Sequence, residues 1–191
     1  MKTILSKAVI KFMLMASVVA SCNVSAIDNV SVLEAQEIEA IKKDLSTIFN
    51  LDREEAAKFS SWIRSAYVGS EGKVNYSHIV AVIYVESTFR ESARSHAGAI
   101  GPMQVKPFFW KEWCGLDVSR PKENIECGAK ILGHYAYEYC DGDYNCAFQM
   151  YNVGPSGYME SENDAAKIRY LNKINLALKM IENSVVLNEK G

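Results

Sequence analysis

The chain has 191 residues, of which 49% are hydrophobic and 23% charged. This length and composition are ordinary for one globular domain with a real core, and they exclude disordered, collagen-like and polytopic membrane proteins. The formal net charge is −2, and no stripe rich in lysine or arginine occurs, so nucleic acid is not an expected partner.

Residues 1–26 have the layout of a secretory signal peptide. Three lysines precede a short apolar run over residues 12–20, which ends in small residues. The run is too short to span a bilayer. Removing the three lysines leaves 18 basic against 23 acidic residues, a net charge of −5 for the mature chain.

Two cleavage sites are compatible with this leader. Val24, Ser25 and Ala26 fit ordinary signal cleavage, whereas residues 19–22 resemble the lipobox of bacterial lipoproteins. Cleavage at the lipobox would remove residues 1–21 and leave Cys22 as a lipid-anchored N-terminus. We favour cleavage after Ala26, because polar and small residues separate it from the apolar run.

Four cysteines remain besides Cys22, an even number in an exported chain. Of the three connectivities, we favour Cys114 with Cys127 and Cys140 with Cys146, because each pair closes a short loop. Zinc is not expected, because no Cys-x-x-Cys occurs and the histidines lack ligand spacing. We predict no metal site.

Residues 27–70 are predicted to form N-terminal helices. Ser31 and Glu34 make a capping box, and Asp52 and Glu55 repeat the pattern before a second helix. The apolar stripes are Ile38, Ile41, Leu45 and Ile48 in the first helix and Phe59, Ile63, Ala66 and Tyr67 in the second. We expect both stripes to pack on the core; the alternative for the first is an arm that binds a partner.

A further helix is predicted to begin near Asn75 or Ser77 and to end near Phe89, before the polar run of residues 91–101. Glu86 should therefore lie in or near its last turn. At helical spacing it shares one inward stripe with apolar residues. The stripe consists of Ile79, Val82, Ile83, Glu86 and Phe89.

Two effects at this position oppose ionisation of Glu86. Partial burial disfavours the charged form, and the unpaired carbonyls at the helix end add a partial negative charge. We therefore predict a raised pKa, which suits a carboxyl that acts as a general acid and then as a general base. The alternative is a glutamate turned to the surface or held in a structural ion pair.

Small residues dominate residues 92–101, where Gly98 and Gly101 allow a sharp turn or close approach to a ligand. An aromatic segment follows. Rings stack on sugar faces, yet aromatic clusters more often fill cores. We assign the segment to packing and keep Trp110 as a groove candidate. Its members are Phe108, Phe109, Trp110 and Trp113.

Three later elements are predicted. Asn124 can cap a helix. Residues 141–145 begin like a calcium loop, but Cys146 replaces the required glycine, so we predict a turn between helices instead. A short helix then runs to Tyr151 and ends at Gly154 and Pro155. The last helix, capped by Asn163 or Asp164, should direct Ile168, Leu171, Asn175 and Leu178 inward.

Several of these motifs together resemble the signature of the soluble lytic murein transglycosylase family. They are Glu86-Ser87, Ser95, the run Gly-Ala-Ile-Gly-Pro-Met-Gln at residues 98–104 and the run Met-Tyr-Asn at residues 150–152. The resemblance covers about Val74 to Ile174. Two positions depart from the family: Pro102 replaces a usual leucine and Met150 a usual alanine. Both flank functional side chains and bear on the shape of the pocket.

The resemblance implies a mainly α, lysozyme-like domain of the goose-lysozyme/transglycosylase type. We place this catalytic domain at residues 71–184 and a tail at residues 185–191. Such an enzyme acts on peptidoglycan in the periplasm without a cofactor. It cuts between N-acetylmuramic acid and N-acetylglucosamine and leaves a 1,6-anhydro end. Glu86 would be both acid and base.

The resemblance also implies a set of substrate-binding residues. Ser95 and Gln104 would offer hydrogen bonds to sugar and Met103 an apolar contact. Tyr151 would orient the carboxyl, and Asn152 would bind an N-acetyl group. The remaining members of the set are Ser87, beside the acid, and Tyr170, near the far end of the groove.

Three alternatives remain open. The first is a hydrolysing muramidase on the same fold, which needs a second carboxylate; none is anchored by a motif, and Glu91 and Glu112 are merely near Glu86 in sequence. The second is a non-catalytic wall-binding or assembly lipoprotein. The third is an accessory of a secretion or conjugation system, which would bind its partner through residues 31–49.

Overall fold

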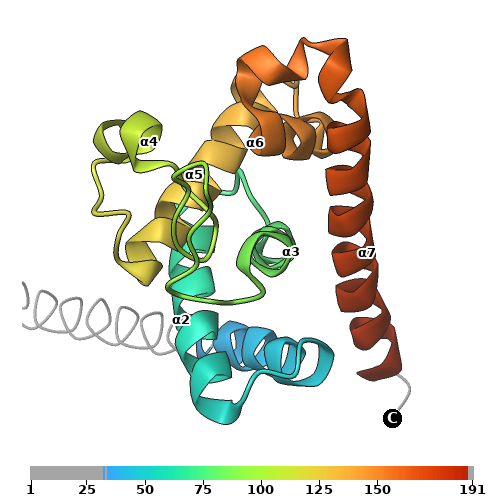
Figure 1. The fold of residues 1–191 in the computed structure, drawn as a ribbon. Coiled ribbons are helices and arrows are strands. Elements are labelled where there is room, and N and C mark those ends of the chain that lie inside the picture. The colour runs from blue at the N-terminus through green and yellow to red at the C-terminus, as the bar shows by residue number, and fades with distance from the viewer. Residues whose placement is uncertain (1–31, 33, 189–191) are drawn as a thin grey trace, which may run out of the picture.

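The computed structural model describes residue 32 and residues 34–188, so the predicted signal peptide, Cys22 and the Ser31 cap lie outside the described part. Within it the chain is mainly helical, as predicted (Figure 1). The described residues form isolated β-bridges but no β-strands. The helices are residues 34–48, α2 (Arg53–Gly69), α3 (Tyr76–Ser87), α4 (Pro107–Cys114), α5 (Pro121–Glu138), α6 (Tyr144–Tyr158) and α7 (Asp164–Asn188), with the 3-10 turn η1 (Ser161–Asn163) before α7.

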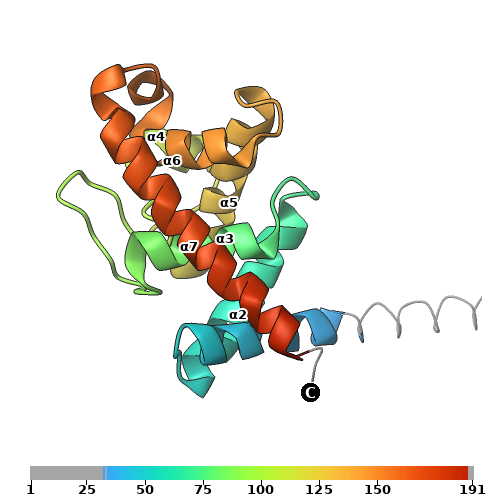
Figure 2. The same ribbon diagram turned by 90° about the vertical axis from the view of Figure 1, so that its right-hand side faces the viewer.

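Helix α3 lies at the centre of the domain. Its middle turn, residues 79–83, consists of five consecutive buried apolar residues. A helix that is apolar on all sides must be surrounded, and α3 is: α2, α5 and α7 all pack against it. Figure 2 shows α7 crossing in front of α3. The sequence of α3 therefore fixes the centre of the core.

The predicted N-terminal helices are confirmed within the described residues. Ile41 and Leu45 are buried in the first, and Phe59 and Ile63 in the second. The side chain of Asp52 accepts a hydrogen bond of 2.8 Å from the amide of Glu55, which is the predicted cap of α2. Both stripes pack on the core rather than standing free. Within the described part, no helix is long and apolar enough to span a bilayer.

The predicted disulfides are confirmed. Cys114 pairs with Cys127 and joins α4 to α5, and Cys140 pairs with Cys146 across the turn before α6. The side chain of Asp143 accepts from the amide of Asn145, so this segment is a capped turn between helices, as predicted. The α6 backbone also breaks where predicted, at Gly154 (φ 75°).

The packing assignment of the aromatic segment was wrong. Phe108 is 92% exposed, Phe109 64% and Trp113 50%; only Trp110 is half-buried against neighbouring rings. Helix α4 is short and packs on α5 through one side. An eight-residue helix that packs chiefly on one other helix has little surface with which to cover four large rings, so three of them are largely exposed.

The predicted inward face of α7 was wrong at two of its four residues, whereas Leu171 and Leu178 are half-buried against the core, as predicted. Ile168 is exposed, as is Asn175, whereas Tyr170 and Ile174 are buried. The cause is Lys167, which is buried and donates to the carbonyl of Tyr158 at 2.7 Å. Because this inward position is a lysine, the pattern of apolar residues alone did not identify the inward face. The observed inward residues are Lys167, Tyr170, Ile174, Ala177 and Ile181.

Candidate active site

Glu86 lies in the last turn of α3, as predicted, and its side chain is half-buried. The helix ends at Thr88, and the chain reverses through two successive non-glycine residues in the left-handed region, Thr88 (φ 54°) and Phe89 (φ 61°). A β-branched residue is costly in this conformation. The buried ring of Phe89 stabilises the reversal by packing on Phe49 and Phe59, so the end of α3 is a fixed point.

The hydroxyl of Tyr170 donates a hydrogen bond of 2.7 Å to Oε1 of Glu86. Tyr170 comes from α7, and the bond links the end of the central helix to the helix that crosses it. The resemblance placed Tyr170 near the far end of a groove. The structure instead places it directly on the predicted acid.

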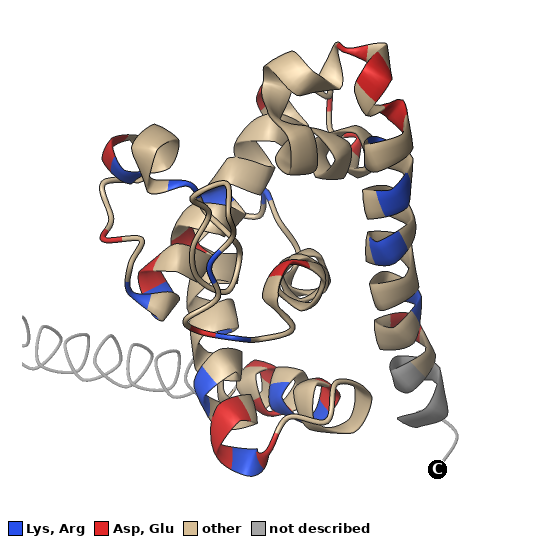
Figure 3. Cartoon of the chain, in the orientation of Figure 1, with Lys and Arg blue, Asp and Glu red and all other residues tan. Residues whose placement is uncertain are grey.

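The pKa of Glu86 is raised to about 7, chiefly because burial disfavours the carboxylate. The hydrogen bond from Tyr170 and the positive charge of Lys173 act in the opposite direction and lower it. Helix α6, which supports α7, carries no Asp, Glu, Lys or Arg, and Figure 3 shows its ribbon free of charge. A carboxyl in this setting keeps a proton near neutral pH and can also release it.

Tyr151 has a different partner from the one expected. Its hydroxyl donates to the backbone carbonyl of Met103 at 2.8 Å, not to Glu86. Burial raises the pKa of Tyr151 well above the ordinary value, and the nearby charge of Glu86 raises it further; the same holds for Tyr170. Both phenols therefore remain protonated donors, one on the acid and the other on the loop beside it.

The loop of residues 92–105 is held by a buried asparagine. The Oδ1 of Asn124 accepts from the amide of Met103 at 2.9 Å, and its Nδ2 donates to the carbonyls of Ile100 and Val118 at 2.9 and 3.0 Å. Gly101 (φ 76°) must be glycine, because a Cβ there would lie 2.5 Å from the Asn124 side chain. The close approach made by Gly101 is thus to α5.

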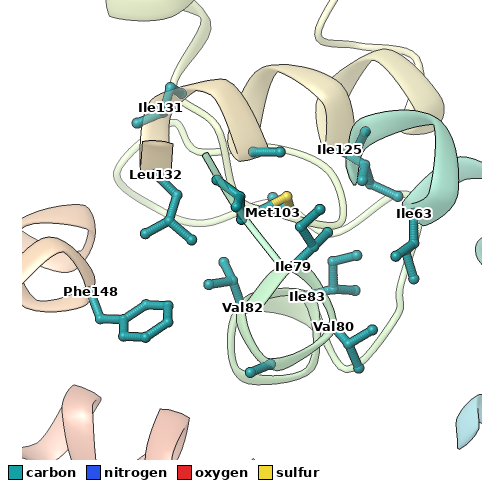
Figure 4. Packing of buried hydrophobic residues seen from close by; sticks show 14 of the residues in the cluster. Ile63, Ile79, Val80, Val82, Ile83, Met103, Ile125, Ile131, Leu132 and Phe148 are labelled. Carbon is teal, nitrogen blue, oxygen red and sulfur yellow. The ribbon is translucent and has the colours of Figure 1, made fainter. Parts of the chain in front are cut away.

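Met103 and Ser87 point into the core. Figure 4 shows Met103 between Ile79 and Ile125, and a Cβ on Gly128 would lie 2.6 Å from its sulfur. The hydroxyl of Ser87 donates back to the Ile83 carbonyl at 3.1 Å. Neither side chain offers a surface to sugar in this structure. What Met103 presents to the site is its carbonyl, the acceptor of Tyr151.

The other predicted substrate-binding residues remain accessible to varying degrees. Ser95 is exposed, and its hydroxyl accepts from the amide of Ala99 at 3.0 Å. Gln104 is half-buried and donates to the Gly101 carbonyl at 2.9 Å. Asn152 is exposed and lies two residues before the break in α6 at Gly154.

Sequence reasoning missed two residues of this site. Asn124 was predicted as a helix cap, whereas it organises the whole loop. The available signal was an asparagine at helical spacing from Gly128 and Leu132, on a face that is otherwise apolar. Lys173, one turn beyond Tyr170, had no signal, since a lysine on a surface helix is ordinary.

The arrangement defines a class of protein. One carboxyl that titrates near neutral pH, held by a phenol in a mainly helical domain, is suited to proton transfer to and from a glycosidic oxygen. The family model of the transglycosylase SLT domain matches residues 65–172, more than half of the chain. The chain belongs to this family. Its function is therefore of the lytic-transglycosylase type, with peptidoglycan as the substrate class and the cell wall as the place of action. The two disulfides fit an oxidising compartment.

Proposed function

We propose that this protein is a peptidoglycan lytic transglycosylase that uses Glu86 as its single acid and base. It cleaves the β-1,4 bond between N-acetylmuramic acid and N-acetylglucosamine and forms a 1,6-anhydromuramyl end. The observation that carries the proposal is the half-buried Glu86 carboxyl, which has a pKa of about 7 and accepts from Tyr170 at 2.7 Å.

The reaction balances with one carboxyl. Protonated Glu86 donates its proton to the glycosidic oxygen as the bond from C1 of the muramic sugar breaks, and the sugar's own N-acetyl oxygen closes on C1. The Glu86 carboxylate then removes the proton from the C6 hydroxyl, whose oxygen displaces the acetyl oxygen at C1. Glu86 ends protonated, and no water is consumed. Tyr170 stabilises the carboxylate between the two steps, because its hydroxyl donates to the charged form.

The surroundings of Glu86 favour this route over hydrolysis. Glycosidases that use water pair two carboxyl groups about 5–9 Å apart. The groups whose charge or hydrogen bond shifts the pKa of Glu86 are a phenol and a lysine, with no carboxylate among them. The nearby acid Glu91 is paired with Lys58.

The remaining roles are divided between contact and support. Exposed Asn152 binds the N-acetyl group, and Ser95 and Gln104 bind sugar hydroxyls at the loop. Tyr151 supports that loop through its hydrogen bond to the Met103 carbonyl. We also propose export to the periplasm through residues 1–26, with an anchor at Cys22 as the alternative outcome of processing.

The test is digestion of purified sacculi with the chain from residue 27 onward, followed by mass spectrometry of the products. We expect 1,6-anhydromuramyl ends. Reducing ends would instead identify a hydrolysing muramidase, and intact sacculi would identify a wall-binding protein.

The Glu86→Gln variant is expected to lose activity by a factor on the order of 10³. Glu91→Gln is the matched control, because it removes a neighbouring carboxyl that is paired with Lys58; it should cut at the wild-type rate. Equal activity of the Glu86→Gln variant and the wild type would refute the assignment of the acid.

A further inference from the structure

A hollow in the surface lies away from Glu86. It has a volume of about 330 Å³ and lies between the turn that joins α2 to α3, Trp113 of α4 and His134 of α5. The turn precedes α3, whereas Glu86 is in its last turn. At 1.5 Å per residue, Glu86 lies roughly 15 Å along the helix from Tyr76, where α3 begins after the turn. A volume near 300 Å³ is at the lower end of the range for small-molecule sites.

A disulfide and a glycine shape this hollow. Cys114, next to Trp113, is bonded to Cys127 of α5, and His134 lies two turns further along α5. At Gly133 a Cβ would lie 3.2 Å from side-chain atoms of Lys73, so the missing side chain lets the turn approach α5. The hollow is thus held open by fixed elements, which lowers the cost of ordering it around a ligand.

Its apolar wall is aromatic. Trp113 is half exposed, and its ring lies 5.1 Å from that of His134 and 5.3 Å from that of Trp110. Trp110 in turn packs at 5.8 Å on the buried ring of Tyr135. The indole of Trp113 is therefore packed on its neighbours with one part of its surface and exposed to solvent with the rest. An aromatic ring presented in this way suits the apolar face of a sugar.

Its polar groups are balanced in charge. Lys73 and Lys130 contribute two positive charges to the lining, and Glu71 and Glu138 two negative ones; Ser70 adds a hydroxyl. A site for an anion or a cation would show an excess of the opposite sign. Donors and acceptors in equal measure around a ring instead match a neutral ligand rich in hydroxyl groups.

We propose that this hollow is a second, non-catalytic binding site for a glycan strand of peptidoglycan. The proposal rests on the substrate class of the proposed function. Because the substrate is a polymer, one molecule of enzyme can hold a strand at Trp113 while Glu86 acts elsewhere, and the second contact raises the effective concentration of cleavable bonds. The site matters for sacculi and not for short soluble fragments.

Binding is tested with a tetrasaccharide of alternating N-acetylglucosamine and N-acetylmuramic acid whose lactyl carboxyls are capped as amides, so that the ligand is neutral, as the balanced charges of the lining require. It is added to the Glu86→Gln variant, which is expected not to cleave it. We expect the indole N–H signal of Trp113 to shift in the NMR spectrum, while that of Trp62, a half-buried residue of α2 outside the lining of the hollow, stays in place. The Trp113→Ala variant should lose one of two binding events. A Trp113 signal that does not move at saturation would overturn the proposal, and this measurement does not depend on turnover.

Activity gives the second readout. Trp113→Ala should release glycan from sacculi roughly 2- to 10-fold more slowly, yet cleave the soluble tetrasaccharide at the wild-type rate. Phe108→Ala is the matched control, since Phe108 is an exposed ring of the same helix outside the hollow; it should behave as wild type on both substrates. Equal slowing by both variants would show that α4 serves as a general apolar contact, and no slowing by Trp113→Ala would also contradict a glycan site.

Discussion

The two ends of α3 present opposite kinds of surface. At the C-terminal end one carboxyl, Glu86, is half-buried beside the phenols of Tyr151 and Tyr170, and its pKa is raised to about 7. At the N-terminal end an open hollow shows a fixed indole and four charges that cancel. Burial shifts the pKa of an ionisable group and so changes its reactivity, whereas exposed groups can still bind a ligand but keep their ordinary chemistry. Our two proposals rest on this difference: they place catalysis at the C-terminal end of α3 and attachment of the glycan at the N-terminal end.

Helix α5 supports both ends in different ways. Asn124, in its first turn, is fully buried and makes two hydrogen bonds to the loop of residues 92–105 and a third to the Val118 carbonyl. Lys130 and His134, further along, face the hollow. Changes along one helix should thus have unequal effects on stability, and this inequality is measurable.

The largest effect on stability is expected from Asn124→Ala. The change removes three hydrogen bonds and leaves the buried amide of Met103 and two carbonyls without partners. We expect the free energy of unfolding to fall by about 4 kcal/mol. Urea denaturation at constant pH measures this, with the slope compared between variants to confirm two-state behaviour.

Lys130→Ala is the control on the same helix. Lys130 is exposed on the rim of the hollow, so the free energy of unfolding should change by less than about 0.5 kcal/mol. Similar losses in the two variants would mean that the first turn and the middle of α5 do not differ as described.

A smaller effect concerns the cost of burying Glu86. The folded-state pKa of about 7 lies above the ordinary value of 4.5, so the folded chain binds the proton more tightly than the unfolded chain does. Glu86 therefore favours folding fully below pH 4.5, and this contribution is lost as pH rises to 7. Relative to Glu86→Gln, the wild type should lose at most about 3 kcal/mol over this range.

The measurement is the difference in free energy of unfolding between the two proteins at several pH values. A constant offset from the substitution itself does not matter, because the slope carries the information. Glu112→Gln, on the exposed surface of α4, serves as the control, and its curve should run parallel to wild type. A flat difference for Glu86→Gln would show that the carboxyl is not buried in solution.

Structural features that depend only on residues close in sequence were predictable. The apolar run of α3 and the cap at Asp52 each depend on neighbours in sequence, and the cysteine pairs depend on short loops. The position of Glu86 followed from the same periodicity. These features are local, so the sequence contains the whole reason for them.

Features that depend on a distant partner were not predictable. Tyr170 and Tyr151 were both predicted as site residues, but which hydroxyl contacts Glu86 depends on how α7 crosses α3. Lys167 faces inward because its ammonium group donates a hydrogen bond to the Tyr158 carbonyl at the end of α6. The exposure of Phe108 follows from the small contact that α4 makes with the other helices of the described part of the chain, chiefly with α5.

The smallest effect, and the most specific, is expected from Tyr170→Phe. Its hydroxyl lowers the pKa of Glu86, so its removal should raise that pKa further. As a general acid Glu86 must begin protonated, and the loss of activity at high pH should therefore move to higher pH. The turnover rate should also fall by about tenfold, because the carboxylate formed midway loses a charge-assisted hydrogen bond.

Tyr151→Phe is the matched control for this prediction. It also removes one buried phenolic hydroxyl, but that hydroxyl donates to the Met103 carbonyl. The pH at which activity declines should then stay at the wild-type value, even if the rate drops because the loop is less well held. If Tyr151→Phe moves the alkaline limb and Tyr170→Phe does not, the roles of the two phenols are reversed during turnover, and α6 rather than α7 controls the proton on Glu86.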